Sequence, residues 1–344
     1  MIPQLGKQTY HPTRWRSRNL VLIYLICTLI VLTHVFFFRP NLHILHETQL
    51  CGFGSSVSTS AKADLSSASD YKFASTNNKP LIPPKIWQNY FGDDLDEDNL
   101  FDAASWLALN KDYAYTLIGK DGADNFINKH FADDPPLLRR YHSLPNFGMK
   151  SDLLRYLVLS VEGGVYTDID TIALRPIKEW VPPSLRHLVR VIVGIEFDQR
   201  DGGLWADIPH ELQFCQWTLA AAGGGHPLFD AMVARALDSF AELERRHNTT
   251  LARLQPANID VLNTTGPAAW TDVVFEHLRR GNPDLVSLRN FSYMEEPTLY
   301  GDILILPIDG FGMGQPHSGS SGGDTIPDVA LVKHNFRGKW RQSD

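Results

Sequence analysis

The chain has 344 residues, of which 43% are hydrophobic and 21% charged, and its net charge is −7. This length and composition suit one large globular domain or two modest ones, and they exclude bulk disorder. The acidic balance argues against nucleic-acid binding, which usually needs a basic face, so no nucleic-acid partner is expected.

An uncharged apolar run fills residues 20–38, and as a helix it would span about 28 Å, close to the hydrocarbon core of a bilayer. The alternative is a cleaved signal peptide, but three phenylalanines close the run and no small-residue cleavage site follows closely. Four basic residues lie within residues 1–19, whereas only Arg39 follows the run closely. Because positive flanks stay cytoplasmic, we predict a cytoplasmic tail, a single-pass type II signal anchor and a lumenal remainder.

Residues 39–80 are rich in Ser, Thr, Ala and Asn and lack sustained hydrophobic periodicity. This composition is typical of a flexible linker, and we predict a lumenal stem that leads to a globular domain at residues 81–344.

Alternating strand and helix patterns follow the stem. Strands are expected at 85–88, 113–118, 165–169, 189–195 and 302–306, and helices at 100–109, 151–161 and 228–243. The Gly163-Gly164 pair ends the helix at 151–161. The alternation predicts an α/β fold with a mostly parallel central sheet.

Two aspartates, Asp168 and Asp170, directly follow the short apolar strand that begins at Val165. Residues two apart in a strand face the same side, so the two carboxylates form a hard-oxygen site suited to Mg²⁺ or Mn²⁺. Ligands of open α/β sheets also gather beyond the carboxyl ends of strands. The alternative is a solvated turn with two surface aspartates, and for an isolated acidic pair that alternative would be preferred.

The preceding helix carries Asp152 and Arg155 three residues apart, hence on one face. The alternative here is an ordinary helix-surface ion pair, which contributes little. The helix nevertheless leads through the glycine turn into the acidic strand end, so the same face can look into the metal cleft.

Residues 150–170 resemble the DxD sugar-binding region of a glycosyltransferase family with the GT-A fold, which includes fungal mannosyltransferases and, more distantly, clostridial glucosylating toxins. The resemblance implies a Rossmann-like nucleotide-sugar-binding domain. It also implies that Asp168 and Asp170 serve the metal and diphosphate, that Asp152 holds sugar hydroxyls, and that Arg155 contacts the donor sugar or phosphate.

Further blocks, at 193–196, 213–218, 265–267 and 332–340, resemble the initiation-specific α-1,6-mannosyltransferases of fungi. That branch implies GDP-mannose as donor, a core N-glycan as acceptor, a Golgi membrane location and a possible mannosyltransferase complex. Residues 82–88 resemble the family's opening strand, which implies that Trp87 and Gln88 border the nucleotide. The alternative for Trp87 is core packing.

The end of the chain resembles that of glycogenin-like enzymes, which implies that His334 completes the metal shell. A neutral imidazole suits Mn²⁺ better than Mg²⁺, and Lys339 could meet the diphosphate as a point charge. The alternative is a surface histidine near a flexible end.

Sequons begin at Asn248, Asn263 and Asn290, and we expect glycan on Asn248 and Asn290. Asn263 adjoins the block at 265–267, which makes it a candidate for the cleft wall instead. The Gly- and Ser-rich stretch 311–328 departs from the resemblance and leaves the acceptor open if it borders the acceptor site.

Together these observations predict a retaining, metal-dependent glycosyltransferase, and the resemblance supplies the stereochemistry. Two alternatives remain. One is the same chemistry with another acceptor or donor, such as inositol-phosphoceramide or a UDP-hexose. The other is a non-catalytic Golgi scaffold subunit, against which the intact acidic and basic residues of the block argue.

Overall fold

The computed structural model describes residues 81–92, 94–203, 205, 208–322 and 325–337. The expected tail, anchor and stem, and also Lys339, lie outside these residues. Across the described part of the chain, no helix is long and apolar enough to cross a membrane.

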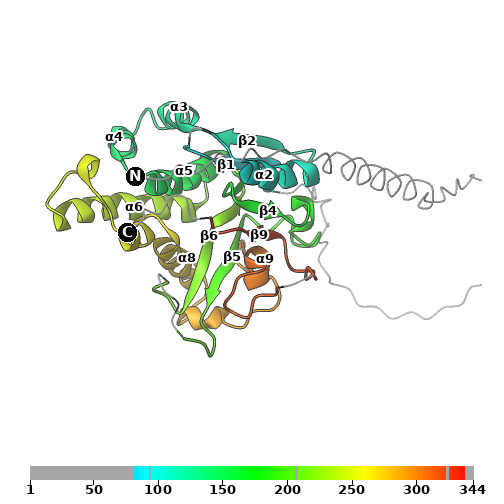
Figure 1. Ribbon diagram of the computed structural model, residues 1–344. Helices are drawn as coiled ribbons and strands as arrows, with labels where there is room; N and C mark the ends of the chain where they lie inside the picture. Colours follow the sequence, from blue (N-terminus) through cyan, green and yellow to red (C-terminus); the bar gives the residue numbers. More distant parts are fainter. Residues whose placement is uncertain (1–80, 93, 204, 206–207, 323–324, 338–344) are drawn as a thin grey trace, which may run out of the picture. The chain divides into compact units, whose positions relative to one another are not determined.

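A seven-stranded sheet with the order β2-β1-β3-β6-β5-β8-β7 lies at the centre of the described residues (Figure 1). Its strands are β1 (Lys85–Asn89), β2 (Ala114–Ile118), β3 (Gly164–Thr167), β5 (Val191–Asp198), β6 (Leu212–Ala221), β7 (Thr298–Tyr300) and β8 (Ile303–Leu306). β1 is parallel to β2 and β3, and β5 is parallel to β8. β6 lies antiparallel between β3 and β5, and β7 is antiparallel to β8. All strands except β6 and β7 therefore share one direction, which confirms the mostly parallel sheet.

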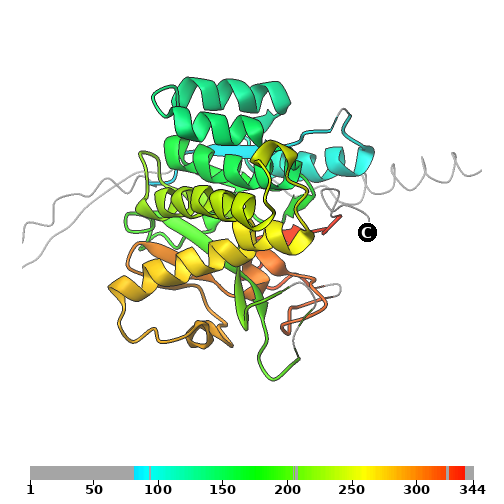
Figure 2. The same cartoon turned by 90° about the vertical axis from the view of Figure 1, so that its left-hand side faces the viewer.

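Helices cover both faces of this sheet. They are α2 (Glu97–Leu109), α3 (Lys120–His130), α4 (Pro135–Ser143), α5 (Phe147–Glu162), α6 (Pro227–Arg246), α7 (Asn258–Thr264), α8 (Pro267–Gly281) and α9 (Ile308–Gly312). One face packs against α5, α6 and α8, which lie in front of the sheet in Figure 2. The other packs against α2, α9 and a small antiparallel sheet of β4 (Thr171–Ala173) and β9 (Val332–His334).

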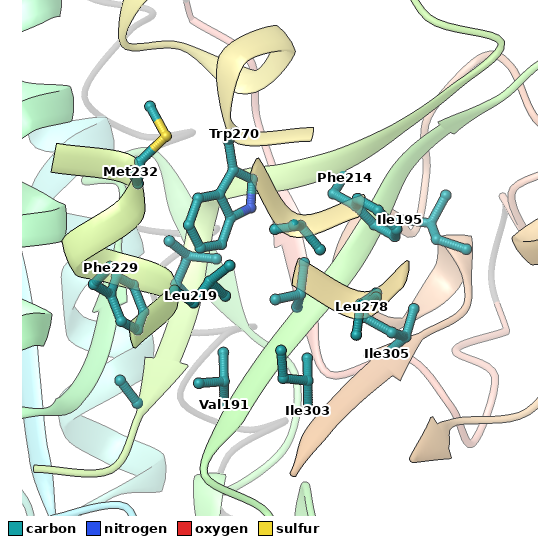
Figure 3. Close-up of a cluster of buried hydrophobic side chains, with 14 of the residues drawn as sticks. Val191, Ile195, Phe214, Leu219, Phe229, Met232, Trp270, Leu278, Ile303 and Ile305 are labelled. Carbon is teal, nitrogen blue, oxygen red and sulfur yellow. The ribbon is translucent and has the colours of Figure 1, made fainter. Parts of the chain in front are cut away.

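Strand β5 supplies apolar side chains to both faces of the sheet. Val191, Val193 and Ile195 point into the cluster beneath α6 and α8, where Trp270 packs (Figure 3). Ile192 points to the opposite cluster. This alternation follows from the two-residue period of a strand, and burial on both faces explains why the segment is almost entirely apolar.

Two helices begin earlier than the apolar pattern predicts. α5 begins at Phe147, because the Asn146 side chain accepts a hydrogen bond from Met149 N at 3.0 Å. α2 likewise begins after Asp96, whose side chain accepts from Asn99 N at 2.8 Å. Polar N-caps therefore fix both starts, outside the apolar pattern.

The predicted stop at Gly163-Gly164 is confirmed. The two glycines have φ values of 61° and 99°, and α5 ends there before β3. A Cβ atom on Gly163 would lie 2.6 Å from Gly223 N, and one on Gly164 would lie 2.7 Å from Lys85 O. Only glycine satisfies both the left-handed backbone and this close approach.

Candidate active site

The acidic pair lies on a tight turn. The strand predicted to reach residue 169 ends at Thr167, and Asp168 to Asp170 then turn toward β4. The Asp168 N–H donates to the Trp217 carbonyl at 2.8 Å, and Gln88 Nε2 donates to the Asp168 carbonyl at 3.0 Å. These bonds to β6 and β1 hold the turn, so the carboxylates converge through the turn and not through strand alternation.

The histidine predicted to complete the metal shell lies beside this turn. β4 pairs with β9 so that Thr171 is opposite His334, which brings a residue from the end of the chain to the pair. The ligand atoms of Asp168, Asp170 and His334 all lie within 4.8 Å of one another. His334 Nε2 is 3.0 Å from Asp170 Oδ1, and the imidazole stacks on Trp217 with ring centroids 4.4 Å apart. The alternative of a free surface histidine is therefore wrong.

The two carboxylates have different electrostatic surroundings. Burial raises the pKa of Asp168 and Asp170 adds to that effect, although Arg155 and His334 oppose it. Burial also acts to raise the pKa of Asp170, but the hydrogen bond and charge of His334 and the Arg337 N–H outweigh it and lower that pKa to about 2. Asp170 is thus held ionised, and a bound cation would favour the ionised form of Asp168 as Arg155 already does.

The donor set fits a divalent cation. Two carboxylates and one imidazole combine hard oxygen ligands with a nitrogen, a combination that Mn²⁺ accepts and Mg²⁺ accepts less readily. Nδ1 of His334 is buried and has no hydrogen-bond partner among the described residues. The chemistry of the three residues therefore suits an ion bound on this turn.

The side chains of Asp152 and Arg155, both on α5, lie in a buried network and not on the protein surface. Asp152 is 5% and Arg155 3% exposed, so the alternative of an ordinary surface ion pair is wrong. Arg155 Nη2 lies 2.9 Å from Asp152 Oδ1 and 3.3 Å from Asp168 Oδ1. Arg155 Nη1 donates to the side chain of Gln216 at 2.6 Å, and Thr265 Oγ1 donates to Asp152 Oδ2 at 2.9 Å. Arg155 therefore links α5 to the turn at residues 168–170, the metal turn.

These groups share one cleft of about 680 Å³. Its walls include Asp152, Arg155, Asp168, Asp170 and His334. The structure therefore brings together predicted site residues from the middle and the end of the sequence. The direct donor roles assigned to them stay predictions.

The residues of the opening strand lie elsewhere. Among the described residues that line the cleft, neither Trp87 nor Gln88 is found. Gln88 is fully buried and holds the Asp168 carbonyl, while Trp87 Nε1 donates to the Gly163 carbonyl at 2.8 Å and its ring packs on the core. Gln88 thus supports the metal turn from behind and Trp87 holds the end of α5. The expected direct contact of both side chains with the donor is corrected to a structural role.

Several cleft residues were missed at the level of sequence. Gln216, Gly266 and Arg337 line the cleft, and Tyr166 donates from its hydroxyl to Asp168 Oδ1 at 2.8 Å. All four lie within the blocks that resemble the family, and that position is the feature of the sequence that could have identified them. Phe147 also lines the cleft and had no such signal.

The sequons lie on the surface of the described residues. Asn248 and Asn290 are exposed, as an acceptor for glycan requires. Asn263 is exposed as well, but it lines a separate surface hollow with Arg235 and Arg246 and not the cleft. The suggestion that Asn263 forms part of the cleft wall is therefore wrong.

Comparisons with known proteins match the part of the chain that carries the acidic pair. Residues 97–186 match the family described as "Glycosyltransferase sugar-binding region containing DXD motif". The chain is 35% identical over 265 residues to the initiation-specific alpha-1,6-mannosyltransferase of Schizosaccharomyces pombe, with 76% of this chain and 64% of that protein covered. It is 32% identical over 296 residues to the protein of the same name from Candida albicans, with 79% and 75% covered. A solved structure titled "PaToxG Glycosyltransferase" is similar at a TM-score of 0.40 and 17% identity, covering 61% of this chain and 75% of that one.

The acidic turn, the cleft and the matched sugar-binding region define a glycosyltransferase. The chain belongs to the family of the initiation-specific α-1,6-mannosyltransferases. It spans slightly less than two thirds of the length of the Schizosaccharomyces pombe relative.

Proposed function

We propose that this protein is a retaining α-1,6-mannosyltransferase that moves mannose from GDP-mannose to an N-linked glycan and so initiates an outer chain. The observation that carries the proposal is the Asp168–Asp170–His334 cluster in the cleft of a chain from this family. The two relatives bear the name of that activity. Location in the Golgi membrane, with a lumenal catalytic domain and a mannosyltransferase complex as partner, belongs to the same proposal.

Asp168, Asp170 and His334 would hold Mn²⁺, or Mg²⁺ less favourably. The bound ion would offset the negative charge that develops on the leaving diphosphate. Asp170 is ionised by virtue of its neighbours, since its pKa is lowered to about 2 despite burial. Arg155 supplies a fixed positive charge 3.3 Å from Asp168 and thereby keeps the second carboxylate in place.

Retention follows from attack on the same face from which the nucleotide departs. The acceptor oxygen bonds to the anomeric carbon while the bond from that carbon to the β-phosphate oxygen breaks, and the hydroxyl proton passes to the departing diphosphate. Such a reaction needs fixed geometry and stabilisation of the leaving group more than a dedicated base. The buried Asp152–Arg155–Gln216 network supplies that fixed geometry.

An aromatic part of the cleft wall suits the base of the nucleotide. Phe91 follows β1 and Phe147 begins α5, with ring centroids 6.0 Å apart. Phe147 is 49% exposed, and Lys120 Nζ lies 5.5 Å from its ring centroid. An exposed ring next to a cation offers an apolar face and a hydrogen-bond donor, which matches a flat base with carbonyl oxygens.

The described residues indicate less about the acceptor site than about the donor site. The described part of the Gly- and Ser-rich stretch 311–328 does not line the cleft. It folds back on α9, because Asp309 of that helix accepts hydrogen bonds from Ser320 and Ser321. The proposed N-glycan acceptor therefore rests on the family and not on this loop.

The test is a transfer assay with detergent-purified full-length protein. GDP-mannose, UDP-galactose, UDP-glucose and UDP-GlcNAc are each offered with Mn²⁺ or with EDTA, and the acceptor is either a core N-glycan or inositol-phosphoceramide. We expect transfer from GDP-mannose to the N-glycan only, and only with metal. Asp170→Asn should reduce the rate by about 10²-fold or more, since it removes a charged ligand of the ion that would offset the negative charge on the leaving diphosphate.

Asp121→Asn is the matched control, because Asp121 is an exposed carboxylate in the first turn of α3. It should transfer mannose at the wild-type rate. Transfer from a UDP-hexose, or to inositol-phosphoceramide, would replace the proposed donor or acceptor. The absence of transfer with every donor would favour a scaffold subunit, and full activity of Asp170→Asn would remove the metal assignment.

A further inference from the structure

The segment after β9 crosses the metal turn and binds it through its backbone. Asn335 N donates to the Asp170 carbonyl at 2.9 Å. Arg337 N donates to Asp170 Oδ2 at 2.8 Å, opposite the oxygen that faces His334. The segment 335–337 thus adds two hydrogen bonds to the residue that His334 also contacts.

The side chains of the same segment reach away from the turn to α2. Asn335 Nδ2 and Arg337 Nη1 both donate to Asp102 Oδ2, at 2.9 and 2.6 Å. Arg337 Nη1 also donates to Asn99 Oδ1 at 2.9 Å. One carboxylate on α2 therefore receives two side chains from a segment more than 230 residues later in the sequence.

Asp102 is only 1% exposed, whereas the cation that it pairs with is partly open to solvent. A buried carboxylate is costly unless it is paired and hydrogen-bonded, so Asp102 and the segment 335–337 stabilise each other. Arg337 and Asn99 line the cleft, and Asp102 lies behind them. The contact is accordingly part of the cleft wall without reaching the reacting atoms.

We propose that Asp102 is a positioning residue that clamps the segment 335–337, so that His334 and the Arg337 N–H are held against Asp170. The proposal rests on the proposed function, because it assigns Asp102 to the same metal site. β9 is only three residues long, so its pairing with β4 gives His334 limited support. The clamp supplies a second attachment three residues further along the chain.

The first experiment measures metal binding and not turnover. Full-length protein in detergent is titrated with MnCl₂ by calorimetry, as wild type and as Asp102→Asn. We expect the variant to bind Mn²⁺ about 10- to 100-fold more weakly, the range typical when a group that orients a ligand is lost. Glu97→Gln is the matched control, since Glu97 is an exposed carboxylate on the same helix. It should bind Mn²⁺ like the wild type.

Hydrogen–deuterium exchange of the peptide that contains residues 332–337 gives an independent readout. We expect faster exchange in metal-free Asp102→Asn than in the metal-free wild type, and unchanged exchange in Glu97→Gln. Arg337→Ala removes the same contact from its partly exposed side and covers the case in which Asp102→Asn folds poorly. Because both substitutions remove the same Asp102–Arg337 contact, the double variant should bind Mn²⁺ no more weakly than the worse single variant.

The outcomes separate the two proposals. If the wild type does not bind Mn²⁺, the metal assignment fails and the clamp fails with it. If the wild type binds and both Asp102→Asn and Arg337→Ala bind equally well, the clamp alone is wrong and the proposed function stands. A lower Tm with unchanged Mn²⁺ affinity would reduce Asp102 to an ordinary structural residue.

Discussion

At the scale of single residues, Arg155 lines the cleft and also joins the helix to the metal turn. It is 3% exposed, and its guanidinium lies between Asp152 and Asp168. It also packs over the Tyr166 ring at 4.7 Å. The planar fork thus holds the helix and the metal turn together, whatever contact it makes with the donor.

We predict that Arg155→Lys does not preserve function. A lysine keeps the charge but cannot reach both carboxylates and Gln216 at once, so the turn carrying Asp168 loses its fixed position. The rate of transfer should fall by about 10²-fold or more. Loss of about two hydrogen bonds should also lower the Tm by roughly 4–8 °C. Steady-state kinetics and thermal unfolding measure the two effects.

Arg140→Lys provides the comparison, because Arg140 pairs with Glu244 in a half-exposed setting outside the cleft. That substitution should leave both the rate and the Tm near wild type. Wild-type kinetics in Arg155→Lys would show that the fork is dispensable.

At the scale of secondary-structure elements, helix α6 has a titratable N-cap. His226 is 2% exposed, and its Nδ1 accepts a hydrogen bond from Leu228 N at 3.2 Å. Burial lowers the pKa of His226, although Asp302 opposes that effect. A doubly protonated ring could not accept the Leu228 N–H, so α6 depends on the neutral form.

The sign of the resulting pH dependence follows from linkage. Because the folded pKa of His226 lies below the unfolded value of about 6.5, its contribution to stability is complete above that pH. The contribution is lost as the pH falls through the folded pKa. We predict that His226→Asn, which keeps a capping acceptor but cannot take a proton, shows a smaller fall in Tm between pH 7.5 and pH 5.

Differential scanning calorimetry at the two pH values measures this difference. His142→Asn is the same substitution at an exposed histidine, and it should retain the wild-type fall in Tm. An equal fall in wild type and His226→Asn would exclude the N-cap as a source of acid sensitivity.

At the scale of the whole molecule, the topology inferred from residues 1–39 stays a prediction. We expect the domain at 81–344 to be lumenal and at least one of Asn248 and Asn290 to carry glycan. Asn248 follows α6 and is exposed, whereas Asn290 Oδ1 accepts hydrogen bonds from the backbone of Val286 and Ser287. Asn248 is therefore the more accessible acceptor of the two.

Protease protection of sealed microsomes, with endoglycosidase treatment alongside, measures this topology. A C-terminal tag should survive protease until detergent is added, and Thr250→Ala should abolish most of the glycosidase shift because it destroys the sequon at Asn248. Digestion of the tag without detergent, together with no glycosidase shift, would place the domain in the cytosol and make an N-glycan acceptor untenable.

The sequence by itself determined the local features of this protein. The apolar spacing of α5, the glycine stop at 163–164 and the acidic pair after β3 all depend on neighbours within a few residues. The order of strands and helices was correct where those patterns were clear. β6 was not recognised as a strand, because all ten of its residues are buried and no two-residue alternation marks it.

The tertiary structure alone decided what meets in the cleft. His334 reaches Asp170 because β9 pairs with β4, and Asp102 meets Arg337 across more than 230 residues of sequence. Arg155 is held between α5 and the metal turn in part because β6 places Gln216 beside it. Contacts between segments so far apart in the sequence are set by packing of the whole sheet, and the local spacing of residues does not predict them.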